Sequence, residues 1–176
     1  MNKSELRKKY ISIRKEVKDK VKKSNSIFEK VIDSEEYKSS RVIGLYKSLP
    51  SEVNTDRLIE YSLNDKVVLL PRVEGDNIVF YRIFNNQEFV KSSFGIYEPT
   101  QGEIITSIDL LIVPGICFDK HCNRIGFGKG YYDRFLEGKD IRTIGICFEE
   151  QICGSIKTDE HDKKLSKVIT DKNIYF

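Results

Sequence analysis

Short apolar runs separated by helical patterns constrain the fold of this chain more than any other feature. The clearest run is Leu110-Leu111-Ile112-Val113, which is too short for a helix and is typical of a buried strand ended by Pro114-Gly115. Further strands are predicted at 41–46, 66–70, 78–84, 142–148 and 167–170. Strands that alternate with helical segments predict an α/β fold, a three-layer sandwich in which helices flank a largely parallel, Rossmann-like sheet.

The strongest helical pattern lies near the N-terminus. Apolar residues recur there at spacings of three and four, at Leu6, Tyr10, Ile13, Val17 and Val21. We expect Ser24-Asn25-Ser26 to end this helix and to begin a second, shorter one. Later helices are predicted from Asn54 or Thr55 to about Leu63, and over 131–136 with Gly138 at the end. Pro71-Arg72 is expected to stop the strand at 66–70. Regularity fades over 85–107, where residues 94–99 are expected to form an ordered loop.

Length and composition suit a single domain over residues 1–176. No apolar run approaches the roughly 20 residues of a membrane span. The first residues lack the apolar core of a signal peptide, so we expect a cytoplasmic monomer with no membrane partner. The four cysteines contain no C-x-x-C pair, and we expect neither disulfides nor a zinc site. Cys117 and Cys147 are interpreted as small buried residues at strand ends.

The formal charge is only +3, and much of the basic excess lies near the N-terminus. Nine cations cluster there: Arg7, Lys8, Lys9, Arg14, Lys15, Lys18, Lys20, Lys22 and Lys23. They could form a nucleic-acid-binding face or the solvated side of an amphipathic helix. Interspersed acids favour the solvated helix, so no nucleic acid is expected as a partner.

Residues 126–130, Gly-Phe-Gly-Lys-Gly, place three glycines in five positions. Glycines allow positive φ and bring backbone N–H groups close to a ligand, and a strand–turn–helix context suits anionic phosphate. Arg124 and Lys129 supply cations and Asp133 a carboxylate for Mg²⁺, so the segment predicts ATP as ligand. It is neither a Walker A loop nor a dinucleotide fingerprint, and a plain tight turn for close packing is the alternative.

Topology predicts where a ligand would meet this loop. In open parallel sheets, ligands bind beyond the carboxyl ends of the strands. The loops after Tyr46, Leu70, Val113 and Phe148 are therefore expected to share one rim and to face one site.

The central segment carries a resemblance to a known family. Residues 114–119 (PGICFD) and 123–134 (NRIGFGKGYYDR) closely resemble the signature of the 5-formyltetrahydrofolate cyclo-ligases, also called methenyltetrahydrofolate synthetases. One departure is Cys122, where the family usually has glycine. Shorter resemblances follow in the family's order at 3–7 (KSELR), at 46–55, and at 160–162 followed by 168–170.

The resemblance implies ATP- and Mg²⁺-dependent conversion of 5-formyltetrahydrofolate into 5,10-methenyltetrahydrofolate, ADP and phosphate. It implies catalytic roles for Arg124, Lys129, Tyr131 and Tyr132, and metal binding by Asp133 and Asp162. The implied ATP-binding residues are Lys3, Arg7, Arg124, Gly126, Gly128, Lys129, Gly130, Tyr131 and Tyr132. The implied folate-binding residues are Lys47, Glu52, Phe127, Gly128, Lys129, Gly130 and Tyr131. Which tyrosine contacts the formyl group stays open.

Two other functions compete with this one. A sugar-phosphate isomerase on a similar α/β scaffold needs phosphate binding but no nucleotide. A basic RNA-binding or regulatory module using the N-terminal helix would show salt-sensitive nucleic-acid affinity and no turnover.

Overall fold

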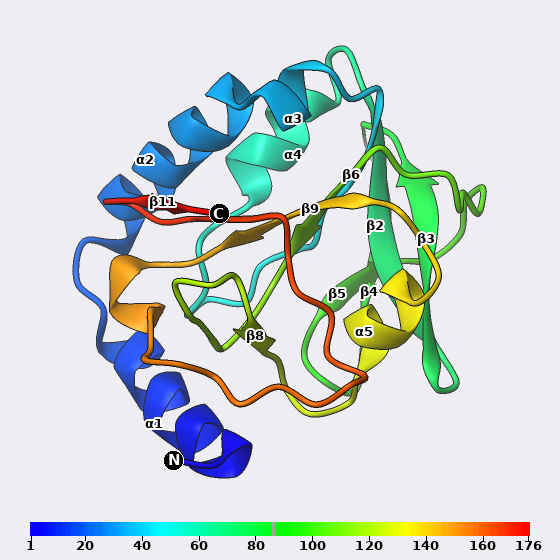
Figure 1. Cartoon of the computed structure of the whole chain (residues 1–176). Helices are drawn as coiled ribbons and strands as arrows, with labels where there is room; N and C mark the ends of the chain where they lie inside the picture. Colours follow the sequence, from blue (N-terminus) through cyan, green and yellow to red (C-terminus); the bar gives the residue numbers. More distant parts are fainter. Residues whose placement is uncertain (86) are drawn as a thin grey trace.

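The computed structural model describes residues 1–85 and 87–176, and its described part is built on a seven-stranded sheet of order β11-β10-β9-β6-β1-β2-β3 (Figure 1). The strands from β10 to β2 run parallel, while β3 and β11 pair antiparallel at the two edges. The bounds are β1 Val42–Gly44, β2 Val67–Glu74, β3 Asn77–Ile83, β6 Leu110–Val113, β9 Arg142–Ile146, β10 Lys167–Ile169 and β11 Ile174–Tyr175. The predicted largely parallel sheet is confirmed.

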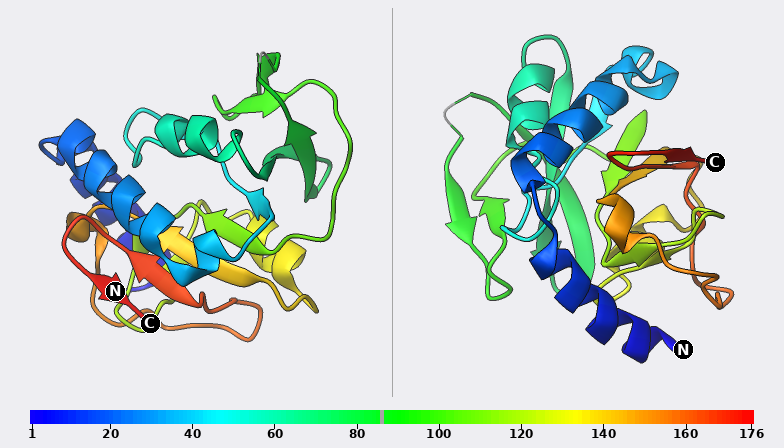
Figure 2. Two further views of the ribbon diagram at one scale, coloured as in Figure 1. Left: turned by 90° about the horizontal axis from the view of Figure 1, so that it is seen from above. Right: turned by 90° about the vertical axis from the view of Figure 1, so that its left-hand side faces the viewer.

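Helices cover both faces of the sheet (Figures 1 and 2). On one face, α2 (Lys20–Asp33), α3 (Glu35–Lys38) and α4 (Asp56–Ser62) bury apolar side chains against β1 and β6. On the other face, α5 (Tyr131–Leu136) packs against β3 and β6. The side chains of β6 are wholly buried because both faces are covered, which explains its unbroken apolar run. The predicted three-layer arrangement is therefore confirmed.

Helix α1 (Lys3–Glu16) lies outside these layers, at the same end of the molecule as the chain leading into α5 (Figure 1). Its Leu6 and Tyr10 pack against the small hairpin of β7 (Cys117–Phe118) and β8 (Arg124–Ile125). It also contacts the 3₁₀ helix η1 (Glu149–Gln151). This apolar cluster holds α1 next to the glycine segment 126–130.

The first helix ends earlier than predicted. Val17 leaves the helical region at φ −56°, ψ 131°, and Asp19 takes the left-handed conformation at φ 55°. Ser24 lies inside α2, where its buried hydroxyl accepts a hydrogen bond from the Asn54 N–H at 3.0 Å. Val21 is 78% exposed and does not continue the apolar stripe. The prediction of a break at 24–26 was wrong because a buried serine was interpreted as a cap.

The prediction that Pro71 stops the second strand was also wrong, since β2 continues to Glu74. Its neighbour β1 ends at Gly44, opposite Leu69, so Pro71 lies where the β1 side of the strand has no further partner. Pro71 still pairs with Phe80 of β3. A proline has no N–H to donate and is tolerated where that side of a strand is unpaired.

Asn86 lies outside the described residues. The rest of the segment 85–107 is more regular than predicted, since the sequence suggested only an ordered loop at 94–99. It forms a hairpin of β4 (Phe89–Lys91) and β5 (Tyr97–Pro99). These strands and those of the β7–β8 hairpin have two or three residues each, too few to show an alternating pattern.

No helix in the described ranges is long and apolar enough to cross a membrane. All four cysteines are buried free thiols. Cys117 begins β7 and Cys147 directly follows β9, and both are fully buried, so their interpretation as small residues at strand ends is confirmed. Across residues 1–85 and 87–176, no group of three or more His, Cys, Asp or Glu side chains could hold a metal ion.

Gly145 in β9 offers a test of this packing. A Cβ at this position would lie 2.6 Å from Phe118 Cε1 and 2.8 Å from Leu165 Cδ1, both in buried side chains. We expect Gly145→Ala to lower the free energy of unfolding by about 1–3 kcal/mol, because the core is overpacked. Urea denaturation measures the change. Gly154→Ala, whose Cβ would meet nothing within 4 Å, is the matched control and should change stability by less than about 0.5 kcal/mol. Equal stability of the two variants would contradict this account.

Candidate active site

A cleft of about 840 Å³ opens at the carboxyl edge of the sheet. The loop after β1 lines it with Tyr46, Lys47, Leu49 and Glu52, and β2 and the segment after β6 contribute Pro71, Val73 and Pro114. Its size is in the range of small-molecule binding sites. The loop after β9 does not line the cleft. Two of the four loops predicted to share the site, those after Tyr46 and Val113, therefore reach it, while the residues after Leu70 reach it as part of β2.

The cleft brings together every residue to which the sequence assigned a catalytic, binding or metal-holding role. They are Lys3, Arg7, Lys47, Glu52, Arg124, Gly126, Phe127, Gly128, Lys129, Gly130, Tyr131, Tyr132, Asp133 and Asp162. These residues come from α1, the loop after β1, the segment 124–133 and the chain before β10. Their roles stay predictions, but their convergence is a property of the fold.

The three glycines of 126–130 meet different requirements. Gly128 and Gly130 have positive φ of 94° and 69°, which side chains rarely adopt. Gly126 has no such φ, but a Cβ there would lie 2.7 Å from Arg124 Nη1. Arg7 Nε donates a hydrogen bond to the Gly126 carbonyl at 2.8 Å. The loop is thus tied to α1 by its first glycine and turned by the other two.

Arg124 is the most enclosed of the cations that line the cleft, with its side chain 7% exposed. Its Nη1 donates to the Pro114 carbonyl at 3.3 Å, and its Nη2 lies 3.4 Å from Asp133 Oδ2. Its guanidinium carbon is 5.5 Å from the centre of the Tyr132 ring. Burial lowers the pKa of Arg124, but a guanidinium keeps its charge in proteins. Burial raises the pKa of Tyr132, so its hydroxyl is neutral and can donate.

The two predicted metal ligands are each held by a cation or an N–H group. Asp133 Oδ1 accepts from the Lys163 N–H at 3.1 Å, and its Oδ2 faces Arg124. Asp162 Oδ2 accepts from Lys3 Nζ at 2.5 Å, and Lys3 also contacts Asp159 Oδ2 at 2.6 Å. Burial acts to lower the pKa of Lys3, but these two carboxylates outweigh it and raise the pKa.

The opposite part of the cleft carries Glu52 and Lys47. Glu52 is 7% exposed, and its Oε2 accepts a hydrogen bond from the Leu49 N–H at 2.7 Å. Burial raises the pKa of Glu52, although the Leu49 N–H and the charge of Arg14 act against this. Lys47 Nζ pairs with Asp56 at 2.7 Å.

Sequence reasoning missed two side chains. Arg14 was assigned to the solvated helix face, but it is 3% exposed and stands behind Glu52. Its position four residues after Tyr10 and eight after Leu6, on an otherwise apolar stripe, was a usable signal. Glu98 of β5 lines the cleft and is 7% exposed, and burial raises its pKa. No sequence pattern distinguishes Glu98 from other acids.

Asp119 holds the loop that leads into the site. Its buried carboxylate accepts hydrogen bonds from the N–H groups of His121, Asn123 and Ile156, and from Asn123 Nδ2, at 2.9–3.0 Å. Cys122, in this turn, has a positive φ of 66°. Its conformation therefore explains why glycine suits this position.

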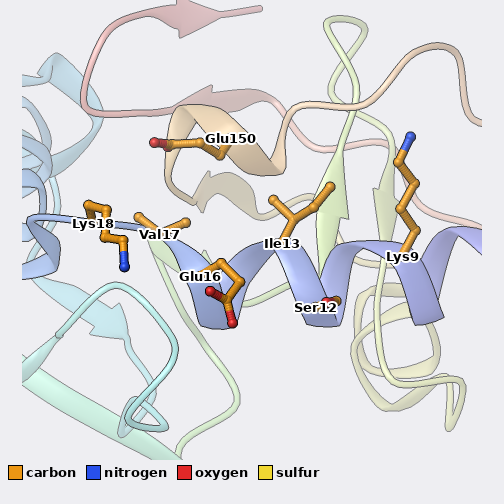
Figure 3. Close-up of a pocket in the computed structure, with 7 residues that line it drawn as sticks. All are labelled: Lys9, Ser12, Ile13, Glu16, Val17, Lys18 and Glu150. Atoms are coloured by element: carbon orange, nitrogen blue, oxygen red, sulfur yellow. The ribbon is translucent and has the colours of Figure 1, made fainter.

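A second, more open hollow of about 570 Å³ lies on another side of α1 (Figure 3). Lys9, Ser12, Ile13 and Glu16 of α1 line it together with Glu150 of η1. None of the predicted site residues lines this hollow. Helix α1 therefore contacts the cleft with one face and η1 with another.

Comparisons with known proteins point to one family. Residues 1–171 match the model of the 5-formyltetrahydrofolate cyclo-ligase family. A 5-formyltetrahydrofolate cyclo-ligase of Mus musculus is 31% identical over 169 residues, which cover 86% of this chain and 83% of that protein. The NMR structure of Aquifex aeolicus 5,10-methenyltetrahydrofolate synthetase superimposes with a TM-score of 0.88 at 33% identity, over 99% of this chain and 92% of that one. A 5,10-methenyltetrahydrofolate synthetase from Mycoplasma pneumoniae gives 0.77 at 27% identity, over 97% and 99%.

The role of Asp119 makes a pH-dependent prediction. Burial acts to raise its pKa, but the four hydrogen bonds outweigh it and hold the pKa below the ordinary value of 3.8. The stabilisation is therefore complete above about pH 4 and is lost as pH falls through the folded-state pKa. Asp119→Asn should lower the free energy of unfolding by about 1–3 kcal/mol at neutral pH, because buried N–H groups lose an acceptor.

Urea denaturation at neutral and acidic pH checks this prediction. The difference between wild type and Asp119→Asn should shrink as pH falls below about 4. Asp140→Asn, at an exposed position, is the matched control. A difference that grows towards acid pH would contradict the assignment.

Proposed function

Because this chain belongs to the 5-formyltetrahydrofolate cyclo-ligase family, we propose that it converts 5-formyltetrahydrofolate into 5,10-methenyltetrahydrofolate with consumption of ATP and dependence on Mg²⁺. ADP and phosphate are the other products. One observation carries the proposal: a cationic glycine loop and a buried carboxylate, Glu52, share a single cleft. The first suits a nucleotide polyphosphate, and the second suits the N–H donors of a pterin ring.

The proposed chemistry overcomes the low reactivity of a formamide. Transfer of the ATP γ-phosphoryl group to the formyl oxygen forms an imidate phosphate and releases ADP. N10 of the folate then attacks the formyl carbon, phosphate leaves with the former formyl oxygen, and N10 loses its proton. The protein's work in such a reaction is positioning and stabilisation of charge, with no covalent enzyme intermediate.

Four cations and the loop backbone suit the phosphates. Lys3 and Arg7 approach from α1, and Arg124 and Lys129 come from the segment before α5. Among the described residues, Lys129 forms no salt bridge and is exposed, so its ammonium is free to meet a phosphoryl group. We assign the ATP site to these cations with Gly126, Gly128, Gly130, Tyr131 and Tyr132.

The residues present fit Mg²⁺. Asp133 and Asp162 line the same cleft and offer hard carboxylate oxygens. Mg²⁺ in phosphoryl-transfer sites typically takes one or two carboxylates, with water and phosphate oxygens completing its shell, so a larger protein cluster is not required. When bound, the ion would neutralise charge on the transferring phosphoryl group. Lys3, which pairs with Asp162 here, would then turn towards the phosphates.

The remaining residues suit the folate. Glu52 would accept hydrogen bonds from the pterin, and Lys47 lies on the same loop. Phe127 is 50% exposed and presents its ring to the cleft. Tyr131 and Tyr132 line the cleft directly after the glycine loop, and the Tyr132 ring meets Phe80 of β3, so their rings and hydroxyls can meet both substrates. We assign Gly128, Lys129 and Gly130 to contacts with both ligands.

We also propose that residues 1–176 act as one catalytic domain and as a monomer on small-molecule substrates. The cleft in the described ranges is lined by elements from one end of the chain to the other, and no second copy is needed to complete it. Four free thiols suit a cytoplasmic location.

The direct test is incubation with Mg²⁺, ATP and 5-formyltetrahydrofolate, with the near-ultraviolet absorbance of the methenyl product as readout. We expect product and ADP in equal amounts. The absence of product at all Mg²⁺ concentrations would refute the proposal. Binding of sugar phosphates without ATP consumption would instead favour an isomerase.

Lys129→Ala should lower kcat roughly 10²–10³-fold, because it removes charge compensation in the transition state. Thermal unfolding should stay unchanged, since the Lys129 side chain is exposed. Lys120→Ala is the matched control, because this exposed lysine precedes the same segment without lining the cleft. Near wild-type turnover of Lys129→Ala would remove the lysine from the reaction.

Asp162→Asn should raise the Mg²⁺ concentration needed for half-maximal activity, because a neutral amide binds this ion more weakly than a carboxylate. Asp159→Asn is the matched control, since both substitutions remove one partner of Lys3 but only Asp162 is assigned to the metal. Titration of activity with Mg²⁺ measures both. The same Mg²⁺ requirement in the two variants would contradict the assignment.

A further inference from the structure

Arg14 is deeply buried but makes few hydrogen bonds. It is 3% exposed, yet its Nη1 makes only long contacts of 3.5 Å, to Glu52 Oε1 and to the Gly115 carbonyl. Its Nε is buried without a hydrogen-bond partner in the described part of the chain. Burying a guanidinium is costly unless it is paired, so this position needs an explanation other than stability alone.

The partner of Arg14 is Glu52, whose carboxylate we assign to folate binding. Glu52 receives one short hydrogen bond, from the Leu49 N–H, and its other oxygen faces Arg14. The charged and titratable groups around it are Arg14 from α1, Tyr46 after β1 and Tyr132 of α5. Burial raises the pKa of both tyrosines, so neither supplies charge near neutral pH. Arg14 is therefore the positive charge that balances Glu52.

The arginine is held in place from several sides. Its guanidinium carbon lies 5.6 Å from the centre of the Phe127 ring. The Gly115 carbonyl that it contacts also accepts a hydrogen bond from Gln151 Nε2 of η1, at 3.3 Å. These contacts keep the guanidinium between the carboxylate of Glu52 and the chain that follows β6.

Helix α1 links this pair to the phosphate side of the cleft. Lys3, Arg7 and Arg14 are separated by steps of four and seven residues, which return to nearly the same side of a helix. Lys3 contacts Asp162, Arg7 contacts the Gly126 carbonyl, and Arg14 contacts Glu52. One rigid element thus reaches the metal, phosphate and folate parts of the site.

We propose that Arg14 is a positioning residue that keeps the Glu52 carboxylate charged and directed at the folate, so that the folate site is complete only while α1 is seated. The inference rests on the proposed function, because it takes Glu52 as the folate contact. A charged carboxylate accepts hydrogen bonds at both oxygens, whereas a protonated one presents an O–H donor to the N–H groups of the ligand. Loss of the arginine would therefore weaken folate binding without touching the ligand.

The test uses Arg14→Met, which keeps side-chain length and removes the charge, and Arg14→Lys, which keeps the charge. Arg14→Met should weaken 5-formyltetrahydrofolate binding roughly ten- to hundredfold at neutral pH. Arg14→Lys should recover most of this affinity. Calorimetric binding of 5-formyltetrahydrofolate and, separately, of ATP measures the effect, and ATP affinity should stay close to that of the wild type.

The pH dependence of folate affinity distinguishes this role from a structural one. Without Arg14 the pKa of Glu52 rises further, so the loss of affinity at low pH should begin at a higher pH in Arg14→Met than in the wild type. Glu52→Gln removes the carboxyl group that titrates. In a Glu52→Gln background, Arg14→Met should therefore cause little further loss of folate affinity. An unshifted pH profile, or additive losses in the double variant, would overturn the proposal.

Two further variants distinguish a loss of folding from a loss of folate binding. If Arg14→Met does not fold, Arg14→Lys and Glu52→Gln still decide the question. The proposal requires Arg14→Lys to keep the wild-type pH dependence of folate affinity. It also requires the folate affinity of Glu52→Gln to stop falling at low pH. The opposite result in either variant contradicts the proposal. Failure of the wild type to bind folate would refute the proposed function. Wild-type binding with an unaffected Arg14→Met would refute only the role of Arg14.

Discussion

Parallel pairing of β2, β1, β6 and β9 is the constraint on which the rest of the structure depends. It aligns the carboxyl ends of these strands, so loops far apart in sequence leave the sheet at one edge. The apolar run of β6 is buried on both faces, which fixes where Pro114 and the segment after it must emerge. Without this alignment of the strand ends, the glycine loop and the loop carrying Glu52 would not face one cleft.

Two arginine–carboxylate pairs, each with a buried arginine, characterise the site. Arg14 stands 3.5 Å from Glu52, and Arg124 stands 3.4 Å from Asp133. Each arginine also has a buried Nε without a partner in the described chain, which a stability argument alone does not explain. The pairs hold opposite charges close together in a partly buried setting, where electrostatic interactions with a ligand are stronger than in bulk water. A site of this kind is charged and oriented before its substrates arrive.

Helix α1 shows how an apparently peripheral element becomes part of such a site. Leu6 and Tyr10 fix it against the β7–β8 hairpin, and its cations then reach the glycine loop through Arg7 and Glu52 through Arg14. The basic composition of this helix suggested a solvated face. Lys8, Lys9 and Lys15 are exposed as expected, but Arg14 is an exception, because the helix turns this one cation towards the protein interior.

The sequence by itself determined the α/β class, the strand at 110–113, the glycine loop and the family motif around it, because these depend on local periodicity, backbone freedom and residue spacing. Only the tertiary structure decided that β2 passes through Pro71, that Glu98 lines the cleft and that Arg14 lies beside Glu52. The pairing of Lys3 with Asp162 joins residues 159 positions apart, and the contact of Arg14 with Gly115 spans 101. Such contacts arise from strand order and helix packing, which no local pattern records.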